Sequence, residues 1–270
     1  MTIATHDIAW CATTPKRALD TDPHGSASLK SVGTALDVME CFALDGELGV
    51  SDIARKLGVA KSTAHRLLQT LVSRGFVEQD RHTGLYRLGM HLYELGQLAL
   101  ARNSLRHVAL PTLRHVAGAT GLTVNFAVAD GPDVVFVERI ESRDGIRFLG
   151  HVGRRFPAHC TSSGKAIAAF NRELEEARRQ AGFPPRVSKT VRTARDWGAA
   201  LTLVRRDGYA VSHSESFDGA SSVAMPVVVR GVAIASVSVF GPSEMVAPHV
   251  DRLVPLLFAA TRRIAKTQAP

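Results

Sequence analysis

A run of hydroxyl side chains followed by a lysine occupies the segment HCTSSGKA, residues 159–166. Hydroxyl groups and free backbone N–H groups at the start of a helix bind carboxylates and phosphates. Lys165 would lie one turn into that helix, where it could neutralise an acid or simply be solvated. Ser and Thr also cap helices for purely structural reasons. The segment therefore predicts an anion site, a helix cap, or both together.

The same segment contains Ser162 and Lys165 in S-x-x-K spacing, which penicillin-binding proteins and class A β-lactamases use for their nucleophile and lysine. Those enzymes also need S-D-N and K-T-G, and neither tripeptide occurs here. The sequence also lacks GxSxG, P-loop, HExxH and GxGxxG motifs. We therefore expect no catalysis, and we keep a hydrolase or transferase joined to a DNA-binding domain as the alternative.

The cysteines Cys11, Cys41 and Cys160 are far apart and odd in number. They form neither a disulfide framework nor a CxxC metal pair, which is typical of a reducing cytoplasm. His159, Cys160 and His213 could in principle hold a metal, but single histidines are more often ordinary polar residues. We expect no metal and no cofactor.

A second set of candidate contact residues lies on one face of a helix predicted over about 61–74. Ala64, Leu67, Leu68 and Leu71 recur at the spacing of a buried stripe. The opposite face carries short polar side chains and basic ones, which can contact the phosphates and base edges of DNA. The alternative is the solvated face of an ordinary helical hairpin. The predicted DNA contacts are Lys61, Ser62, Thr63, His65, Arg66, Gln69 and, on the following hairpin, Arg81.

The flanking elements predict a winged helix-turn-helix. A first helix is expected over about 31–43, and a second has Ser51 as its N-cap and ends at Gly58, where glycine turns without a Cβ penalty. Strands at 76–78 and 85–88, joined by a Gly-containing turn, would form the wing.

The net charge of +8 suggests a polyanionic partner. Residues 1–100 nevertheless hold about 10 Lys and Arg against about 11 Asp and Glu, so the surplus lies in the second half. The local basic run supports DNA binding better than the net charge does; it comprises Arg55, Lys56, Lys61, Arg66 and Arg74.

The length of 270 residues is enough for two domains. We divide the chain into a tail (1–28), a winged domain (29–89), a linker helix (90–103) that acts as a semi-rigid rod, and a C-terminal domain (104–270). No apolar run is long enough for a bilayer and no secretory signal is present, so we expect a soluble cytoplasmic protein without a membrane partner.

The C-terminal domain mixes helical and β-rich segments, which predicts an α+β fold with helices packed on an antiparallel sheet. Asp130 to Asp133 and Arg230-Gly231 are the expected hairpin turns. Strands are expected near 123–129, 134–140, 146–152, 210–215, 222–229 and 232–240, and helices near 105–119, 163–171, 196–207 and 248–266.

Several segments in combination resemble the IclR family of bacterial transcription regulators, over about residues 29–266. They include SVGTALDVMECF, LGVAKSTAHRLLQTLVSRGFVEQD, VGRRFPAHCTSSGKA, DGYAVS and IASVSVFGP. The resemblance implies an N-terminal winged helix-turn-helix and a C-terminal effector-binding domain related to the GAF fold. It also implies homodimers or homotetramers on palindromic promoter sites in double-stranded DNA, modulated by small organic acids.

Carried over by motif, the resemblance implies an effector pocket closed by the loop around SGKA. Many members have Arg-Cys where this chain has Ser221-Ser222, and Phe240 would narrow the pocket. The implied pocket residues are Asn125, Cys160, Thr161, Ser162, Ser163, His213, Ser222 and Ser238.

The predicted function is therefore that of a DNA-binding transcriptional regulator whose operator affinity is modulated by a small organic carboxylate. The acid would bind at the 160–165 loop, with Asn125, His213 and Ser238 at the other end and Val and Phe side chains over the apolar part. His213 would make binding pH-dependent. One recognition helix has a small footprint, so a homo-oligomer is expected. A structural nucleic-acid binder would not need a second domain with a pocket.

Overall fold

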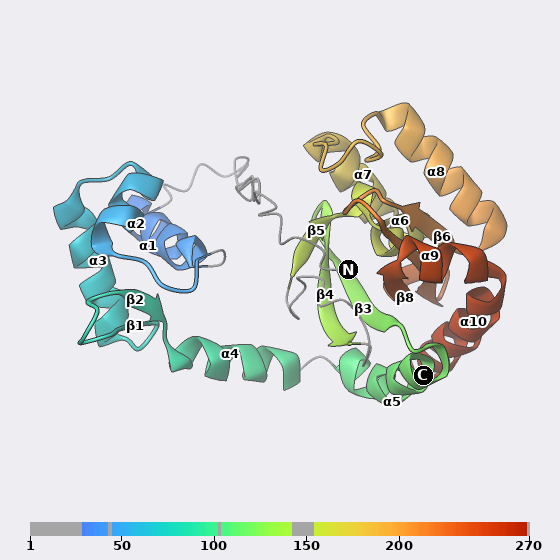
Figure 1. The fold of residues 1–270 in the computed structure, drawn as a ribbon, viewed down its shortest axis with the longest axis horizontal. Coiled ribbons are helices and arrows are strands. Elements are labelled where there is room, and N and C mark those ends of the chain that lie inside the picture. Colours follow the sequence, from blue (N-terminus) through green and yellow to red (C-terminus); the bar gives the residue numbers. More distant parts are fainter. Residues whose placement is uncertain (1–28, 43–44, 102–103, 142–153, 269–270) are drawn as a thin grey trace, which may run out of the picture. The chain divides into compact units, whose positions relative to one another are not determined.

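The computed structural model describes residues 29–42, 45–101, 104–141 and 154–268 (Figure 1). The chain forms two compact units, Met1–Leu98 and Ala99–Pro270. The boundary between them falls inside helix α4 (Met90–Ala101), within the predicted linker helix. The predicted tail and the predicted strand at 146–152 lie outside the described residues.

The first unit has the order of a winged helix-turn-helix: α1 (Lys30–Cys41), α2 (Val50–Leu57), α3 (Lys61–Ser73), β1 (Val77–Gln79) and β2 (Tyr86–Leu88). The predicted stripe of α3 is confirmed, because Ala64, Leu68 and Leu71 are buried and Leu67 is partly buried against the same core. The two strands pair in antiparallel fashion to form the wing.

The start of α2 differs from the prediction. Ser51 is not the N-cap, because the helix begins one residue earlier, at Val50, with Gly49 as its cap. The N–H group of Gly49 donates to Oδ2 of Asp52 at 3.3 Å, so this carboxylate takes the capping role. The predicted end is confirmed: Gly58 adopts a left-handed conformation with φ of 65°.

The second unit is built on a six-stranded antiparallel sheet with strand order β5-β4-β3-β8-β7-β6. Both predicted hairpin turns are confirmed: β3 runs into β4 through Gly131, and β7 runs into β8 through Arg230 and Gly231, all at positive φ. The strands are β3 (Thr123–Asp130), β4 (Asp133–Ile140), β5 (Arg155–Pro157), β6 (Ala210–His213), β7 (Ala220–Val229) and β8 (Val232–Pro242).

Helices cover both faces of this sheet, as the α+β prediction requires. On one face α5 (Ser104–Thr120) and α10 (Val250–Lys266) pack over an apolar core that contains Phe126, Val237 and Leu257. On the other face lie α6 (Ser162–Ala168) and α8 (Ala194–Asp207), with α7 (Arg172–Ala181) nearby (Figure 1). The short helix α9 (Ser243–Val246) and two 3-10 helices, η1 (Ala158–Cys160) and η2 (Ala247–His249), complete the unit.

The elements α7, β5 and the four-residue helix α9 (Ser243–Val246) were not predicted. The sequence of α7 has too few apolar residues to show the 3.6-residue spacing of a buried helix face. Only Leu174 and Arg178 of this helix are buried. The helix depends instead on its cap, since Asn171 accepts a hydrogen bond from the N–H group of Leu174 at 3.1 Å. Strand β5 has three residues, which is too short for an alternating pattern.

Candidate functional site

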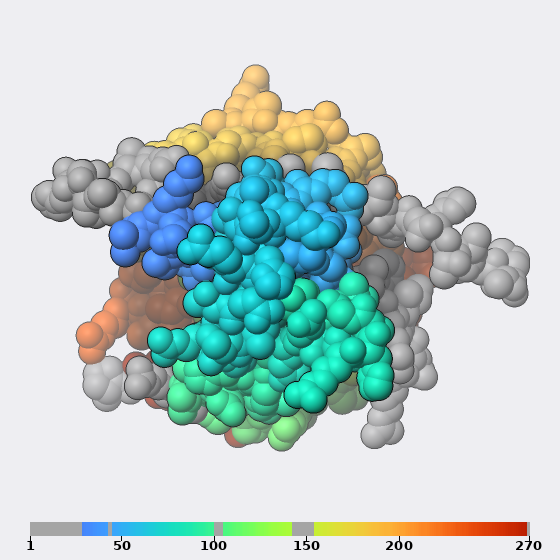
Figure 2. Space-filling model, turned by 90° about the vertical axis from the view of Figure 1, so that its left-hand side faces the viewer, coloured from blue at the N-terminus to red at the C-terminus, as the bar shows by residue number. Residues whose placement is uncertain are grey.

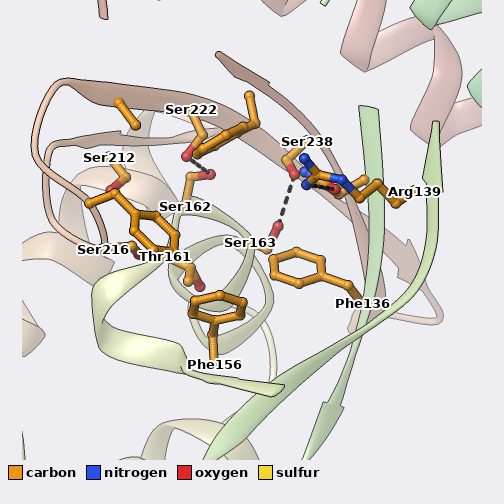
Figure 3. Close-up of a pocket in the computed structure, with 14 residues that line it drawn as sticks. Phe136, Arg139, Phe156, Thr161, Ser162, Ser163, Ser212, Ser216, Ser222 and Ser238 are labelled. Atoms are coloured by element: carbon orange, nitrogen blue, oxygen red, sulfur yellow. Dashed lines mark hydrogen bonds between the residues drawn. The ribbon is translucent and has the colours of Figure 1, made fainter. Parts of the chain in front are cut away.

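A cavity lies between the sheet and the start of α6 (Figure 3). Its floor is the sheet face opposite α5 and α10, and its walls come from β5, from the start of α6 and from the chain after β6. The lining residues are Asn125, Phe136, Arg139, Phe156, Thr161, Ser162, Ser163, Ser212, Ser216, Phe217, Ala220, Ser222, Ser238 and Phe240.

One row of residues across the sheet supplies the polar floor. Arg139 of β4 pairs in register with Asn125 of β3, which pairs with Ser238 of β8. A β-bulge makes this row possible: Phe126 pairs with Glu138 but Ala127 pairs with Phe136, so one extra residue of β4 stands between. Because of the bulge, Arg139 shares the cavity face with Phe136 despite their odd spacing.

The hydroxyl groups at the start of α6 are hydrogen-bonded into the structure. Thr161 is the N-cap and accepts from the N–H group of Gly164 at 2.9 Å, so the structural explanation of this segment holds for Thr161. Ser162 lies 2.7 Å from the hydroxyl of Ser222, and Ser163 donates to Ser238 at 3.1 Å. These pairs connect the helix start to the sheet on the cavity wall.

Four phenylalanine rings form the apolar part of the cavity, where Val and Phe side chains were expected. Phe136 and Phe217 each meet Phe156 edge to face, with centroid distances of 5.6 and 5.8 Å. The guanidinium of Arg139 lies 5.9 Å from the centroid of Phe240.

Guanidinium groups gather on one side of this cavity. Arg139 donates to Oδ1 of Asn125 at 3.2 Å. Arg186 lies over the ring of Phe156, 5.2 Å from its centroid. Burial, together with nearby Arg186 and Arg139, lowers the pKa of Arg154. Of these three groups, the guanidinium of Arg139 lines the cavity and brings a positive charge to it.

Two of the predicted pocket residues do not line the cavity. Cys160 is fully buried behind it, where its thiol donates to the carbonyl of Pro157 at 3.1 Å and burial raises the pKa of the thiol to about 11. His213 is exposed at the end of β6, with Nδ1 3.2 Å from the hydroxyl of Ser221. Successive strand residues point to opposite faces, so the neighbouring Ser212 enters the cavity instead.

Lys165 is neither solvated nor in the cavity. It is 4% exposed, and its Nζ donates to the carbonyl of Val211 at 2.6 Å and to the carboxylate of Glu215 at 2.7 and 2.9 Å. Ser162 is paired with Ser222 rather than with this lysine. An S-x-x-K hydrolase needs a hydrogen bond between its serine nucleophile and its lysine, and here both groups are bonded elsewhere, so this geometry argues against that interpretation.

His159 lies in the interior beside Cys160. Its Nε2–H donates to the carbonyl of Pro184 at 3.0 Å, and burial lowers its pKa to about 4. Within the described parts of the chain, no three His, Cys, Asp or Glu side chains come together as metal ligands would.

Sequence reasoning missed Arg139, Ser212, Ser216 and the phenylalanine walls other than Phe240. A charged residue inside a strand otherwise rich in Val and Phe was an available signal for Arg139. The bulge that turns it into the cavity has no signature in the sequence of β4.

The predicted DNA-contact residues all lie on the exposed surface of the first unit, in α3 and at the tip of the wing. Figure 2 looks onto this unit, with the blue-to-cyan atoms of its helices toward the viewer. The basic residues of α2 are paired at the surface, Arg55 with Asp52 at 2.6 Å and Lys56 with Asp45 at 2.8 Å. At the wing, Asp80 accepts from the backbone N–H groups of residues 82 and 83, which shapes the turn that carries Arg81.

Both units match sequence models of known protein domains. The sequence model of the bacterial transcriptional regulator IclR C-terminal domain matches residues 97–266, and that of the IclR helix-turn-helix domain matches residues 31–81. The glycerol operon regulatory protein of Streptomyces griseus is 35% identical over 202 residues, which cover 74% of this chain and 80% of the relative.

Solved structures agree with this assignment. An IclR transcriptional regulator from Alicyclobacillus acidocaldarius matches with a TM-score of 0.76 and 27% identity, over 89% of this chain and 99% of that one. An IclR homologue from Microbacterium hydrocarbonoxydans, complexed with 4-hydroxybenzoate, matches with a TM-score of 0.74 and 30% identity, over 87% of this chain and 98% of that one.

A winged helix-turn-helix unit followed by an α+β effector-binding unit defines a two-domain, DNA-binding transcriptional regulator. The chain belongs to the IclR family of bacterial transcriptional regulators. None of the helices in the described part of the chain is both long and apolar enough to cross a membrane.

Proposed function

We propose that this protein binds a promoter site and that a small organic acid, bound in the cavity of the second unit, changes its affinity for that site. The observation that supports this most is the cavity itself, which combines an arginine, an amide and several hydroxyl groups with four aromatic rings. The complex of the Microbacterium homologue with 4-hydroxybenzoate supports a ligand of this kind. The proposed contacts are Asn125, Thr161, Ser162, Ser163, Ser222 and Ser238, without Cys160 and His213.

The exposed face of α3 and the wing tip are the proposed DNA contacts. The stripe of α3 that contains Leu68 is buried, so the polar face is directed to solvent. Lys61 and Arg66 have no ion-pair partner among the described residues, which leaves their charges available to phosphates and bases. The proposed contacts remain Lys61, Ser62, Thr63, His65, Arg66, Gln69 and Arg81.

Exposed apolar side chains support a homodimer or homotetramer on a palindromic site. On α1, Val32 and Leu36 are 53% and 52% exposed and line an apolar surface groove with residues of α3. On α4, Tyr93 and Leu98 are each 62% exposed. Apolar surface of this kind marks interaction sites, and a two-fold pair would present two recognition helices to two half-sites. We retain α4 as the connecting helix between the two units.

We propose that the protein acts as a binder and not as an enzyme, because Lys165 is held by Glu215 and not by Ser162. We also propose a cytoplasmic location, because a promoter-binding regulator works where the chromosome is.

Selection of DNA sites from a random library with the full-length protein tests the first part of this proposal. An enriched inverted repeat is expected, and a selection without any enriched sequence would contradict it. Sedimentation with and without the selected DNA tests the oligomer, and a monomer under both conditions would reject that part.

Titration of a panel of organic acids into the protein–DNA complex tests the effector. A Ser162→Ala, Ser163→Ala double variant should lose acid binding in calorimetry while keeping its affinity for the selected DNA. Unchanged acid affinity in this variant would place the ligand outside the cavity.

A further inference from the structure

We infer that the ligand of the cavity is an aromatic monocarboxylate, whose acid group pairs with Arg139 and Asn125 and whose ring lies among the phenylalanines. This inference rests on the proposed function and specifies the chemical class of the ligand and its orientation in the cavity. It reverses the orientation expected from the sequence, in which the acid group lay at the 160–165 loop.

Charge fixes where the acid group binds. Among the described residues that line the cavity, Arg139 is the one formally charged side chain, and the other polar groups are an amide and hydroxyls. Its guanidinium is hydrogen-bonded to Asn125, so the two side chains present N–H donors side by side. A guanidinium binds a carboxylate through two parallel hydrogen bonds, which a lysine or a hydroxyl cannot reproduce.

One of the partners of Arg139, the carboxylate of Glu141, is solvent-exposed and exchangeable. Its Nε lies 3.4 Å from Oε1 of Glu141, whose side chain is 54% exposed, whereas the side chain of Arg139 is 11% exposed. A ligand carboxylate in the cavity would replace the solvent-exposed carboxylate of Glu141 as the ion-pair partner of Arg139. Less water would surround the new ion pair, so the attraction between its charges would be screened less. The guanidinium groups of Arg154 and Arg186, which lie near Arg139 and over Phe156, add positive charge that disfavours a cationic ligand.

The shape of the walls selects a planar ring. Phe156 already makes edge-to-face contacts with Phe136 and Phe217, and Phe240 closes the side on which Arg139 lies. An aromatic ligand would extend this cluster with further ring contacts, each worth more than the same apolar area alone. A short aliphatic acid would leave part of these walls uncovered.

The opposite end of the cavity is polar but uncharged. Figure 3 shows Ser212, Ser216 and Thr161 at the end away from Arg139, with Ser162 and Ser222 between. Hydroxyl groups both donate and accept, so they suit a hydroxyl substituent on the ring rather than a second charged acid.

Calorimetry with the full-length protein tests this inference through four probes of similar size: benzoate, 4-hydroxybenzoate, benzamide and cyclohexanecarboxylate. Benzamide removes the charge and cyclohexanecarboxylate removes the aromatic ring. The benzoates are expected to bind about tenfold or more tightly than benzamide.

Variants test the residues. Arg139→Gln should abolish this preference, Arg139→Lys should restore part of it, and the exposed Arg192→Gln should leave it unchanged. Phe136→Leu should weaken benzoate more than cyclohexanecarboxylate.

An unchanged acid-to-amide ratio in a folded Arg139→Gln protein would overturn the assignment of the acid group. If Arg139→Gln does not fold, an acid-to-amide ratio in Arg139→Lys that equals the wild-type ratio overturns it instead. Equal or tighter binding of cyclohexanecarboxylate would overturn the aromatic class while leaving an organic-acid effector in place. If none of the four probes binds in calorimetry, this inference is overturned. The proposed function is not, because DNA-site selection and the wider panel of organic acids test it separately.

Discussion

Nζ of Lys165 lies 2.7 Å from Oε1 of Glu215 inside the second unit, with side-chain exposures of 6% and 15%. This pair connects α6 to the chain after β6, where Ser216 and Phe217 line the cavity. Two more contacts hold the same segment: Thr190 donates to the carbonyl of Glu215 at 2.8 Å, and Ser216 donates to the carbonyl of Cys160. The wall of the cavity is therefore held in part by a buried ion pair that does not itself line the cavity.

Replacement of Lys165 by Met should lower the free energy of unfolding by about 3 kcal/mol, because it leaves the carboxylate of Glu215 buried without its charge partner. The double variant with Glu215→Gln should be less destabilised than the sum of its parts. Urea denaturation of both single variants and the double variant measures this coupling. Lys189→Met at an exposed position is the control and should change stability by less than about 0.5 kcal/mol. Additive effects would show that the pair contributes nothing.

Gly164 should not tolerate a side chain. A Cβ atom at this position would fall far inside van der Waals contact with the carbonyl oxygen of Ala158, so α6 would have to move away from the turn before it. Gly164→Ala is expected to destabilise the protein by about 1–3 kcal/mol and to weaken acid binding. Gly198, inside α8, is the matched control, because nothing lies within 4 Å of a Cβ there. Gly198→Ala should stabilise by about 0.5–1 kcal/mol. Thermal unfolding that ranks the two variants the other way would contradict this account.

Arg66→Ala should weaken binding to the selected DNA site without unfolding the protein. The side chain is exposed on α3, opposite the buried stripe, so its loss leaves no cavity. If Arg66 reads a guanine, discrimination should fall by about 1–3 kcal/mol. Gel shift at fixed salt measures the change, with Arg192→Ala in the second unit as the control. Equal affinities of the variant and the wild type would remove Arg66 from the interface.

Stability should fall in mild acid because of His159. Its pKa is about 4 in the folded protein against 6.5 for the free side chain, so below about pH 6.5 the unfolded chain takes up a proton that the folded chain excludes. The loss grows as the pH falls from 6.5 to 4 and reaches about 3 kcal/mol. Urea denaturation between pH 7.5 and 4.5 should show a shallower pH dependence for His159→Gln than for the wild type. The exposed His249→Gln should keep the wild-type slope, and identical slopes for all three proteins would refute the prediction.

The sequence by itself determined those local features that depend on residues close together in the chain. The stripe of α3 that includes Ala64 and Leu68, the left-handed end of α2 at Gly58 and the tight turn at Gly231 each follow from residues close together in the chain. Periodicity and turn chemistry act over a few residues, so they could be recognised without a fold. The same holds for Thr161 as a cap, because a cap bonds to a group three residues away.

Only the tertiary structure decided which side chains meet in the cavity. A one-residue bulge in β4 turns Arg139 into the cavity, and the phase of β6 turns Ser212 in and His213 out. The burial of Lys165 depends on Glu215, which is distant in the chain. The neighbouring strand sets the register of a strand, and a one-residue shift of that register exchanges the side chains of its two faces. An ion pair likewise depends on a residue that the fold brings close. For this reason the motif around SGKA located the site, while the packing of the sheet decided its chemistry.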